Sequence, residues 1–508
     1  MVSDYKKLIW KYFERNGFID ANIGSFDNFV EKVLPKIVEE VGEIRPTIIP
    51  ENVEDFVIKL NKIWVGEPQL IEADGSKRII FPMEARLRQL TYAAPVFLEV
   101  SAYIDGLQVE NFATQIGKLP IMVRSKHCNL HGLKRDEMIE KGEDPDDTGG
   151  YFILNGNERV LLMVEDLARN RAFIGRNAIG PSRYTLRVFS ESGALSIPHL
   201  IEQMTDGTLY LSFTRFKRVP VFAVIKALGM VKDQDITMMI NAEKDYEDVF
   251  INLYKASEWK GEEDALDFLA RQIGITQGRE IKIQRAREYL DRYLLPHLGE
   301  NSKDRITKAY NLCKMVKKFL MVAKDGCSLT DKDHYSNKRI KLPGDLLADL
   351  FRINTRVLVS DMLYNFQRLV KRGKFNSIKI IIRDKLLTNR ITSAMATGSW
   401  PGGRQGVSQN IDRTNFLGTM SHLLRVVSLL SSTQENFDAR ALHGTHYGKL
   451  CPIETPEGTS IGLRKNLAML CSVSHENLEI AEKNKVEELL YEIGVKKPGA
   501  AGATGAGK

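Results

Sequence analysis

The sequence predicts a multidomain α+β protein that combines helices with antiparallel sheets. Three observations support this prediction. The chain has 508 residues, too many for a single hydrophobic core, so about three domains are expected. Apolar residues recur at helical spacing in several segments. Other segments are short, rich in β-branched or aromatic residues, and bounded by glycine or proline, as strands are.

The predicted elements change in type along the chain. Helices are expected over residues 1–45 and strands over 46–125. A charged, turn-rich surface segment follows at 134–148, and then a strand and a turn in "GGYFILNGNERVLL". The later elements are strands within 183–214, helices over 241–256 and 308–324, a long amphipathic helix over 343–372, and a Gly-rich loop over 397–415.

Composition narrows the class of protein without fixing its function. Hydrophobic residues make up 43% and charged residues 27%, as in ordinary soluble globular proteins. The net charge of +7 permits a nucleic-acid partner but does not require one. No apolar run reaches the roughly 18–20 residues of a membrane span, and the N-terminus lacks the pattern of a signal peptide. The five cysteines are widely scattered, which favours reduced thiols and a cytosolic location.

The C-terminal stretch 496–508 is a low-complexity Gly/Ala segment that we expect to be disordered. Gly502 to Lys508 fits the spacing of a phosphate-binding loop. No strand precedes it and no Ser or Thr follows it, so a nucleotide site is not expected there.

The stretch "ETPEG" over 454–458 predicts a rigid turn. Pro456 fixes its own φ and favours an extended residue before it, and Gly458 tolerates positive φ. Glu454 and Glu457 are compatible with a pair of catalytic acids, as in glycosidases. The interpretation we favour is that they form ion pairs with Arg440, Arg464 or Lys465.

Two further patterns carry candidate chemistry. "HGTHYGKLC" brings His443, His446 and Cys451 close in sequence, but a structural zinc site needs four ligands and no second pair is near. Hydrogen-bonding histidines and a buried thiol are the favoured interpretation.

The second pattern is a run of cations spaced by small polar residues. This composition suits contact with phosphates but also a solvated basic face. The cations are Arg404, Arg413, Arg425, Arg440, Lys449, Arg464 and Lys465.

Several long strings resemble one family. "GVSQNIDRTNFLGTMSHLLRV" and "ALHGTHYGKLCPIETPEGTSIGLRKNLAML" resemble the fork of the second-largest subunit of multisubunit DNA-dependent RNA polymerases. "EARLRQLTY", "LPIMVRSKHCNL", "GGYFILNGNERVLL" and "DKDHYSNKRI" resemble its protrusion and lobe. The resemblance covers nearly all of residues 80–475, and its details are closest to the archaeal and eukaryotic branch. Intact family members continue well beyond the "ETPEG" turn. The chain therefore resembles B'', the N-terminal half of a split archaeal subunit, and an N-terminal piece of an unsplit subunit would look similar.

The resemblance implies a division into five parts. These are the first part of the protrusion (1–165), the lobe (166–340), the return segment of the protrusion (341–393), the fork (394–473), and a C-terminal extension (474–508). It also implies nucleic-acid-binding roles for a set of fork residues: Arg404, Ser408, Gln409, Asp412, Arg413, Asn415, His422, Arg425, Arg440, Glu457, Arg464 and Lys465.

The implied function is that of a DNA-directed RNA polymerase subunit in the cytoplasm, which forms one side of the DNA cleft and positions template, RNA and downstream duplex. The implied partners are B', the largest subunit, template DNA and nascent RNA, with no membrane. Mg²⁺ would be held mainly by another subunit, so the isolated chain would be inactive, with no catalytic or metal-binding residue of its own. The alternatives are a stand-alone basic nucleic-acid-binding protein and a hydrolase that uses Glu454 and Glu457.

Overall fold

The computed structural model describes residues 2–15, 17–50, 53–72, 74–177, 182–193, 195–241, 244–275, 278–375, 377–433, 436–473 and 480–495. The chain divides into two compact units, Met1–Met469 and Leu470–Lys508. The second unit contains the helix α16 (Ile480–Glu492). The predicted disordered tail over 496–508 lies outside the described residues.

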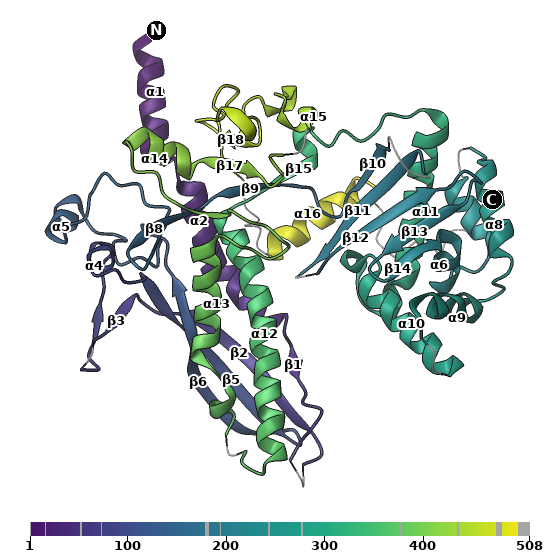
Figure 1. Cartoon of the computed structure of the whole chain (residues 1–508), viewed down its shortest axis with the longest axis horizontal. Helices are drawn as coiled ribbons and strands as arrows, with labels where there is room; N and C mark the ends of the chain where they lie inside the picture. Colours follow the sequence, from purple (N-terminus) through teal and green to yellow (C-terminus); the bar gives the residue numbers. More distant parts are fainter. Residues whose placement is uncertain are drawn as a thin grey trace. The chain divides into compact units, whose positions relative to one another are not determined.

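The first hydrophobic core of the larger unit lies between an antiparallel sheet and a group of helices (Figure 1). The sheet has the order β1-β2-β5-β6, formed by Glu43–Ile44, Phe56–Val65, Ala93–Ile104 and Leu107–Pro120. The helical elements are α2 (Asp20–Asn28), the π-helical turn η1 (Phe29–Val33), α3 (Leu34–Glu39), α12 (Pro343–Lys371) and α13 (Asp384–Thr397). Phe29 meets Phe351, and Phe56 meets Phe366, with ring centroids 6.2 and 4.7 Å apart. The core therefore joins the start of the chain to residues more than 300 positions later.

A second core is separate from the first and continuous in sequence, with buried members from Ile174 to Val322. Its sheet is fully antiparallel in the order β10-β11-β12-β13-β14, formed by Ala172–Arg176, Tyr184–Ser192, Leu195–Gln203, Leu209–Phe213 and Phe216–Pro220. The helices are α6 (Val221–Ala227), α7 (Asp233–Ile240), α8 (Glu247–Ala256), α9 (Glu262–Ile273), α10 (Arg279–Tyr293) and α11 (Arg305–Asp325). We call this region the second core. It lies within the predicted lobe, whose exact boundaries stay a prediction.

Residues 404–466, which we call the basic segment, are built onto two consecutive strands from earlier in the chain. Strand β16 (Ser408–Asn410) pairs with β8 (Asn157–Leu161), which also pairs with β7 (Phe152–Leu154). Strand β17 (Arg425–Ser428) runs parallel to β9 (Met163–Leu167). The sheet around β9 has the order β15-β9-β17-β18, with β15 at Lys338–Lys341 and β18 at Arg464–Asn466.

The basic segment has no hydrophobic core of its own among the described residues. Its buried Val407, Met420 and Leu423 belong to the first core. Its remaining regular elements are short: α14 (Phe416–Leu423), α15 (Phe437–Arg440), η6 (Gly444–His446) and η7 (Gly458–Ser460). Backbone pairing with β8 and β9 therefore positions most of it.

Sequence patterns missed some local structure. The stretch 397–415, predicted as a loop, contains β16, because its backbone pairs with β8, a partner that Gly-rich composition does not reveal. The charged segment 134–148 contains the short helix α5 (Arg135–Glu140). The Glu137 side chain stabilises its N-terminus by accepting a hydrogen bond from the Lys134 N–H at 2.8 Å.

The remaining elements are α1 (Val2–Arg15), β3 (Gln69–Ile71), β4 (Lys77–Ile79), α4 (Pro82–Leu87), η2 (Pro296–Leu298), η3 (Ser302–Asp304), η4 (Tyr335–Asn337) and η5 (Ile378–Ile381). Within the described residues, no helix combines the length and the apolar character that crossing a bilayer would need.

Candidate nucleic-acid interface

Two arginines of the basic segment lie on one face of the sheet and make no ion pair within 4.0 Å in the described part of the chain. Arg425 pairs with Asn466 across β17 and β18, and Arg464 pairs with Val427. Because residues 425 and 427 of a strand point to the same face, Arg425 and Arg464 share that face. Both are half-buried, and no ion pair within 4.0 Å joins either to an acid among the described residues.

The electrostatics of this pair favour a bound anion. Burial lowers the pKa of Arg425 from its ordinary value, and the positive charge of Arg464 lowers it further, while the nearby carboxylates of Glu454 and Asp412 offset only part of this shift. Two guanidinium groups repel each other more strongly when they are partly shielded from water. An anion bound between them offsets this repulsion. Phosphate oxygens accept the forked hydrogen bonds that arginine offers.

His422 and Asp412 hold the loop that precedes α14. The Asp412 N–H donates to Nδ1 of His422 at 3.1 Å, which leaves Nε2 to donate toward Oε1 of Gln409 at 3.4 Å. Burial, with the nearby Arg425, lowers the pKa of His422 to about 4, so the ring is neutral at pH 7. Asn415 caps α14 by accepting the Gly418 N–H at 2.6 Å. These polar groups are engaged within the chain.

Three other predicted cations are paired with acids inside the protein. Arg404 pairs with Asp166, and with Asp349 at 3.4 Å. Arg413 pairs with Glu158 at 2.7 Å and lies over the ring of Tyr151, and Lys465 pairs with Glu165 at 3.1 Å. Their roles in nucleic-acid binding stay predictions. The role of Ser408 also stays a prediction; its side chain is buried, and its Oγ has no hydrogen-bond partner among the residues that the structure describes.

Arg440 organises the turn that carries Glu457. Its guanidinium donates to the carbonyls of Thr459 at 2.7 Å, Ile461 at 3.1 Å and Ser432 at 2.9 Å. The backbone at Gly462 lies so close to the backbone of Arg440 that a Cβ on Gly462 would be 2.2 Å from the Arg440 carbonyl oxygen. Arg440 thus binds backbone across the turn. Glu457 is exposed, and Gly458 has the positive φ (77°) that its position predicted.

One important residue was missed by sequence reasoning. Glu165 on β9 is buried, and its carboxylate accepts from Lys338 at 2.7 Å as well as from Lys465. Burial would raise the pKa of Glu165, but the two lysines outweigh it and lower that pKa. Burial and Lys338 also lower the pKa of Lys465. The available signal was a charged residue inside the apolar strand "LLMVEDL".

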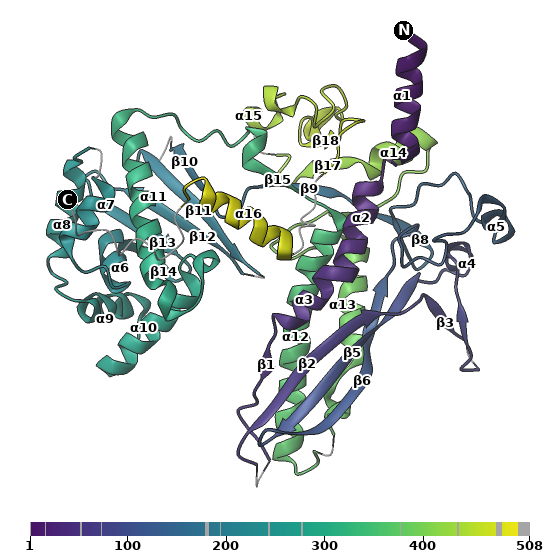
Figure 2. The ribbon, with the colours of Figure 1, turned by 180° about the vertical axis from the view of Figure 1, so that it is seen from behind.

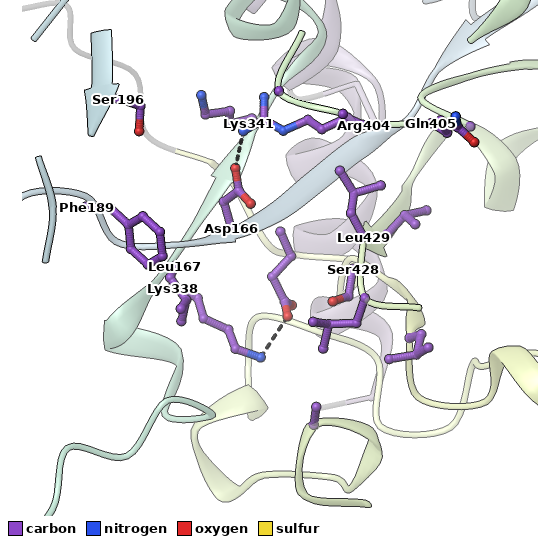
Figure 3. A pocket seen from close by; sticks show the side chains of 18 of the residues that line it. Asp166, Leu167, Phe189, Ser196, Lys338, Lys341, Arg404, Gln405, Ser428 and Leu429 are labelled. Carbon is purple, nitrogen blue, oxygen red and sulfur yellow. Dashed lines mark hydrogen bonds and ion pairs between the residues drawn. The ribbon is translucent and has the colours of Figure 1, made fainter. Parts of the chain in front are cut away.

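This cluster forms part of the wall of a cavity of about 1240 Å³. Figure 3 shows Lys338, Lys341, Arg404 and Asp166 on that wall, with Phe189 and Ser196 contributed by strands of the second core. Arg464 and Gln409 also line it. Acidic and basic side chains both line the cavity, and several of them form ion pairs: Lys338 with Glu165, Lys341 with Asp349 and Arg404 with Asp166.

The residues of the two alternative sites make other contacts. His443 hydrogen-bonds Asp331 at 3.0 Å, and no group of three or more His, Cys, Asp or Glu in the described part of the chain could hold a metal ion. Glu454 accepts a hydrogen bond from the Ser421 hydroxyl. No shared site with Glu457 is evident from these contacts.

Comparison with known proteins gives a consistent result. The family model "RNA polymerase beta subunit" matches residues 17–392, and "RNA polymerase Rpb2, domain 3" matches 409–473. The chain is 42% identical to DNA-directed RNA polymerase subunit Rpo2N of Methanocaldococcus jannaschii, over 96% of this chain and 99% of that protein. Rpo2N of Halobacterium salinarum is 36% identical over 97% of this chain and 96% of its own length. Rpo2 of Saccharolobus shibatae is 41% identical over 97% of this chain, which spans only 43% of that longer relative.

Proposed function

This chain belongs to the RNA polymerase β-subunit family, and we propose that it supplies the N-terminal part of the second-largest subunit of a DNA-directed RNA polymerase. In that role it forms one side of the DNA cleft, with protrusion, lobe and fork as its parts. Its partners are the remaining part of the second subunit (B' where that subunit is split), the largest subunit, template DNA and nascent RNA. The setting is the cytoplasm.

The observation that carries this proposal is the Arg425–Arg464 pair. Both groups are half-buried, both lie on one face, and they lack a carboxylate partner among the described residues. A phosphate of the RNA or template strand satisfies their charge and their hydrogen-bonding geometry. The other polar groups of the basic segment hold this face in place.

The contribution of the chain is positioning. We propose that the Mg²⁺ ions of the reaction are held mainly by another subunit. A bound phosphate would hold the RNA end in one position. Correct positioning of the reactants can lower the activation barrier by several kcal/mol. Arg440 keeps the Glu457 turn in a fixed shape beside this face.

The test is the salt-dependent dissociation of reconstituted elongation complexes. Removing one charge-assisted contact costs about 1.5–3 kcal/mol, so Arg425→Ala or Arg464→Ala should speed dissociation about 10- to 100-fold. Each should also reduce the slope of log K against log salt by about 1. Arg285→Ala, which removes an exposed cation of α10, is the matched control. If all three variants behave alike, the phosphate-binding role is wrong.

A further inference from the structure

Helix α1 carries an apolar stripe that the described residues leave largely uncovered. Tyr5, Leu8, Ile9, Tyr12 and Phe13 recur at helical spacing on one side of the helix. Its C-terminal end is held, because Phe13 stacks on Phe18 with ring centroids 4.6 Å apart. Further toward the N-terminus, Tyr5, Leu8 and Ile9 are 68%, 71% and 51% exposed.

Such a helix is not expected to be stable in water by itself. A 14-residue helix is near the lower limit for isolated helices, and most helical stability in proteins comes from packing of the apolar face. In Figures 1 and 2 the N-terminal turns of α1 extend beyond the neighbouring elements. The uncovered stripe is therefore expected to pack on another surface.

The elements beside α1 indicate which surface covers its apolar stripe. The following helix α2 is tied to the end of α14, where Asn22 Nδ2 donates to the Leu423 carbonyl at 2.9 Å in a buried contact. The neighbouring α14 adds two exposed apolar side chains, Phe416 (62%) and Leu417 (77%). Both views place α14 beside the base of α1.

The end of the larger unit lies at the same place. Asn466 Nδ2 donates to the Ser421 carbonyl on α14 at 2.9 Å, and the Leu467 N–H donates to the Leu424 carbonyl at 3.2 Å. Two residues later, Met469 is 70% exposed. In the longer relatives, of which this chain spans 43%, the subunit has more than half of its length outside the matched region.

We propose that the α1 stripe, with Phe416 and Leu417, is a docking surface for the remaining part of the second-largest subunit. This inference rests on the proposed function. The chain leaves the larger unit beside α14, so the sequence that follows Met469 starts within reach of α1. The exposed Lys7 and Lys11 lie on the opposite side of the helix and do not interrupt the apolar stripe.

The experiment is co-purification of the full chain with the remaining part of the subunit, expressed as a second chain. Leu8→Glu combined with Ile9→Glu should weaken the association at least tenfold. Lys7→Gln combined with Lys11→Gln changes the net charge by the same amount on the opposite side and should stay within twofold of the wild type. Circular dichroism establishes that both variants remain folded.

A photocrosslinking amino acid at position 8 identifies the occupant, with position 7 as the control. Crosslinks from position 8 to the remaining part of the subunit support the proposal. Crosslinks to nucleic acid, to another subunit, to a second copy or to residues 470–508 of the same chain overturn it. If the wild-type chain binds the remaining part and the Leu8/Ile9 variant binds equally well, only the docking surface is wrong. If the wild-type chain does not bind it at all, the proposed function fails as well.

Discussion

The second core and the basic segment are stabilised in different ways. The second core is continuous in sequence, and its antiparallel sheet and helices enclose fully buried side chains such as Leu312 and Phe319. The described part of the basic segment has short elements that pair with earlier strands, and ion pairs and backbone hydrogen bonds hold it in place. The proposed phosphate contact requires cations that are not buried in an apolar core. The comparison teaches that the basic segment is held in position by polar contacts between residues far apart in the sequence.

The largest expected effect comes from Glu165→Gln. This change leaves Lys465 and Lys338 buried without the carboxylate they share, and breaking a buried ion pair costs about 3–5 kcal/mol. Hydrogen exchange should show lost protection in β17 and β18 and unchanged protection in α11. Adding Lys465→Met should recover part of the loss. Equal loss of protection in α11 would show that the two regions unfold together.

The reciprocal change is Leu312→Ala in the second core. Leu312 is fully buried, so the cavity should cost about 2–5 kcal/mol. The same hydrogen-exchange measurement should now show weaker protection in α10 and α11, with β17 and β18 unaffected. Reduced protection in β17 would contradict the separation of the two cores.

Acid should weaken both regions through buried neutral histidines. Burial lowers the pKa of His199, in the second core, and of His422, in the basic segment, to about 4, against an ordinary value of 6.5. Between pH 6.5 and 4 the unfolded state binds more protons, so stability falls as pH falls through this range, by up to about 3 kcal/mol for each ring. Urea unfolding at pH 7, 6 and 5 measures the effect. His422→Gln should reduce the pH dependence of the basic segment alone, and His446, whose pKa burial and the nearby Lys465 also lower to about 4, should account for the remainder.

The smallest expected effect is that of Arg440→Ala. Losing its hydrogen bonds to the carbonyls of Thr459, Ile461 and Ser432 should cost only about 1 kcal/mol, because the side chain is partly exposed. Exchange should quicken at Ile461 and Leu463, elongation complexes should dissociate faster, and subunit assembly should be unchanged. Arg440→Lys should not restore the turn, since an ammonium group lacks the planar fork. A failure of assembly would show that Arg440 supports more than this turn.

Periodicity identified what local sequence determines. The long helix expected over 343–372 is present as Pro343–Lys371, and the strands expected within 183–214 are present. Family resemblance indicated the class of protein, and the comparisons confirmed it. Local patterns could not reveal that Lys465 is paired with an acid 300 residues earlier, or that Arg440 binds backbone carbonyls. Both depend on strand pairing between distant segments, which composition does not encode.

The parallel pairing of β9 with β17 has a consequence for biosynthesis. During translation, β8 and β9 leave the ribosome long before β16, β17 and β18 are synthesised. Glu165 can form its ion pair with Lys465 only after another 300 residues have been synthesised. Until then their open edges can pair with other chains, a recognised route to aggregation. Completion of this region must therefore come late, so a nascent-chain chaperone that shields these edges would raise the yield of correctly folded protein.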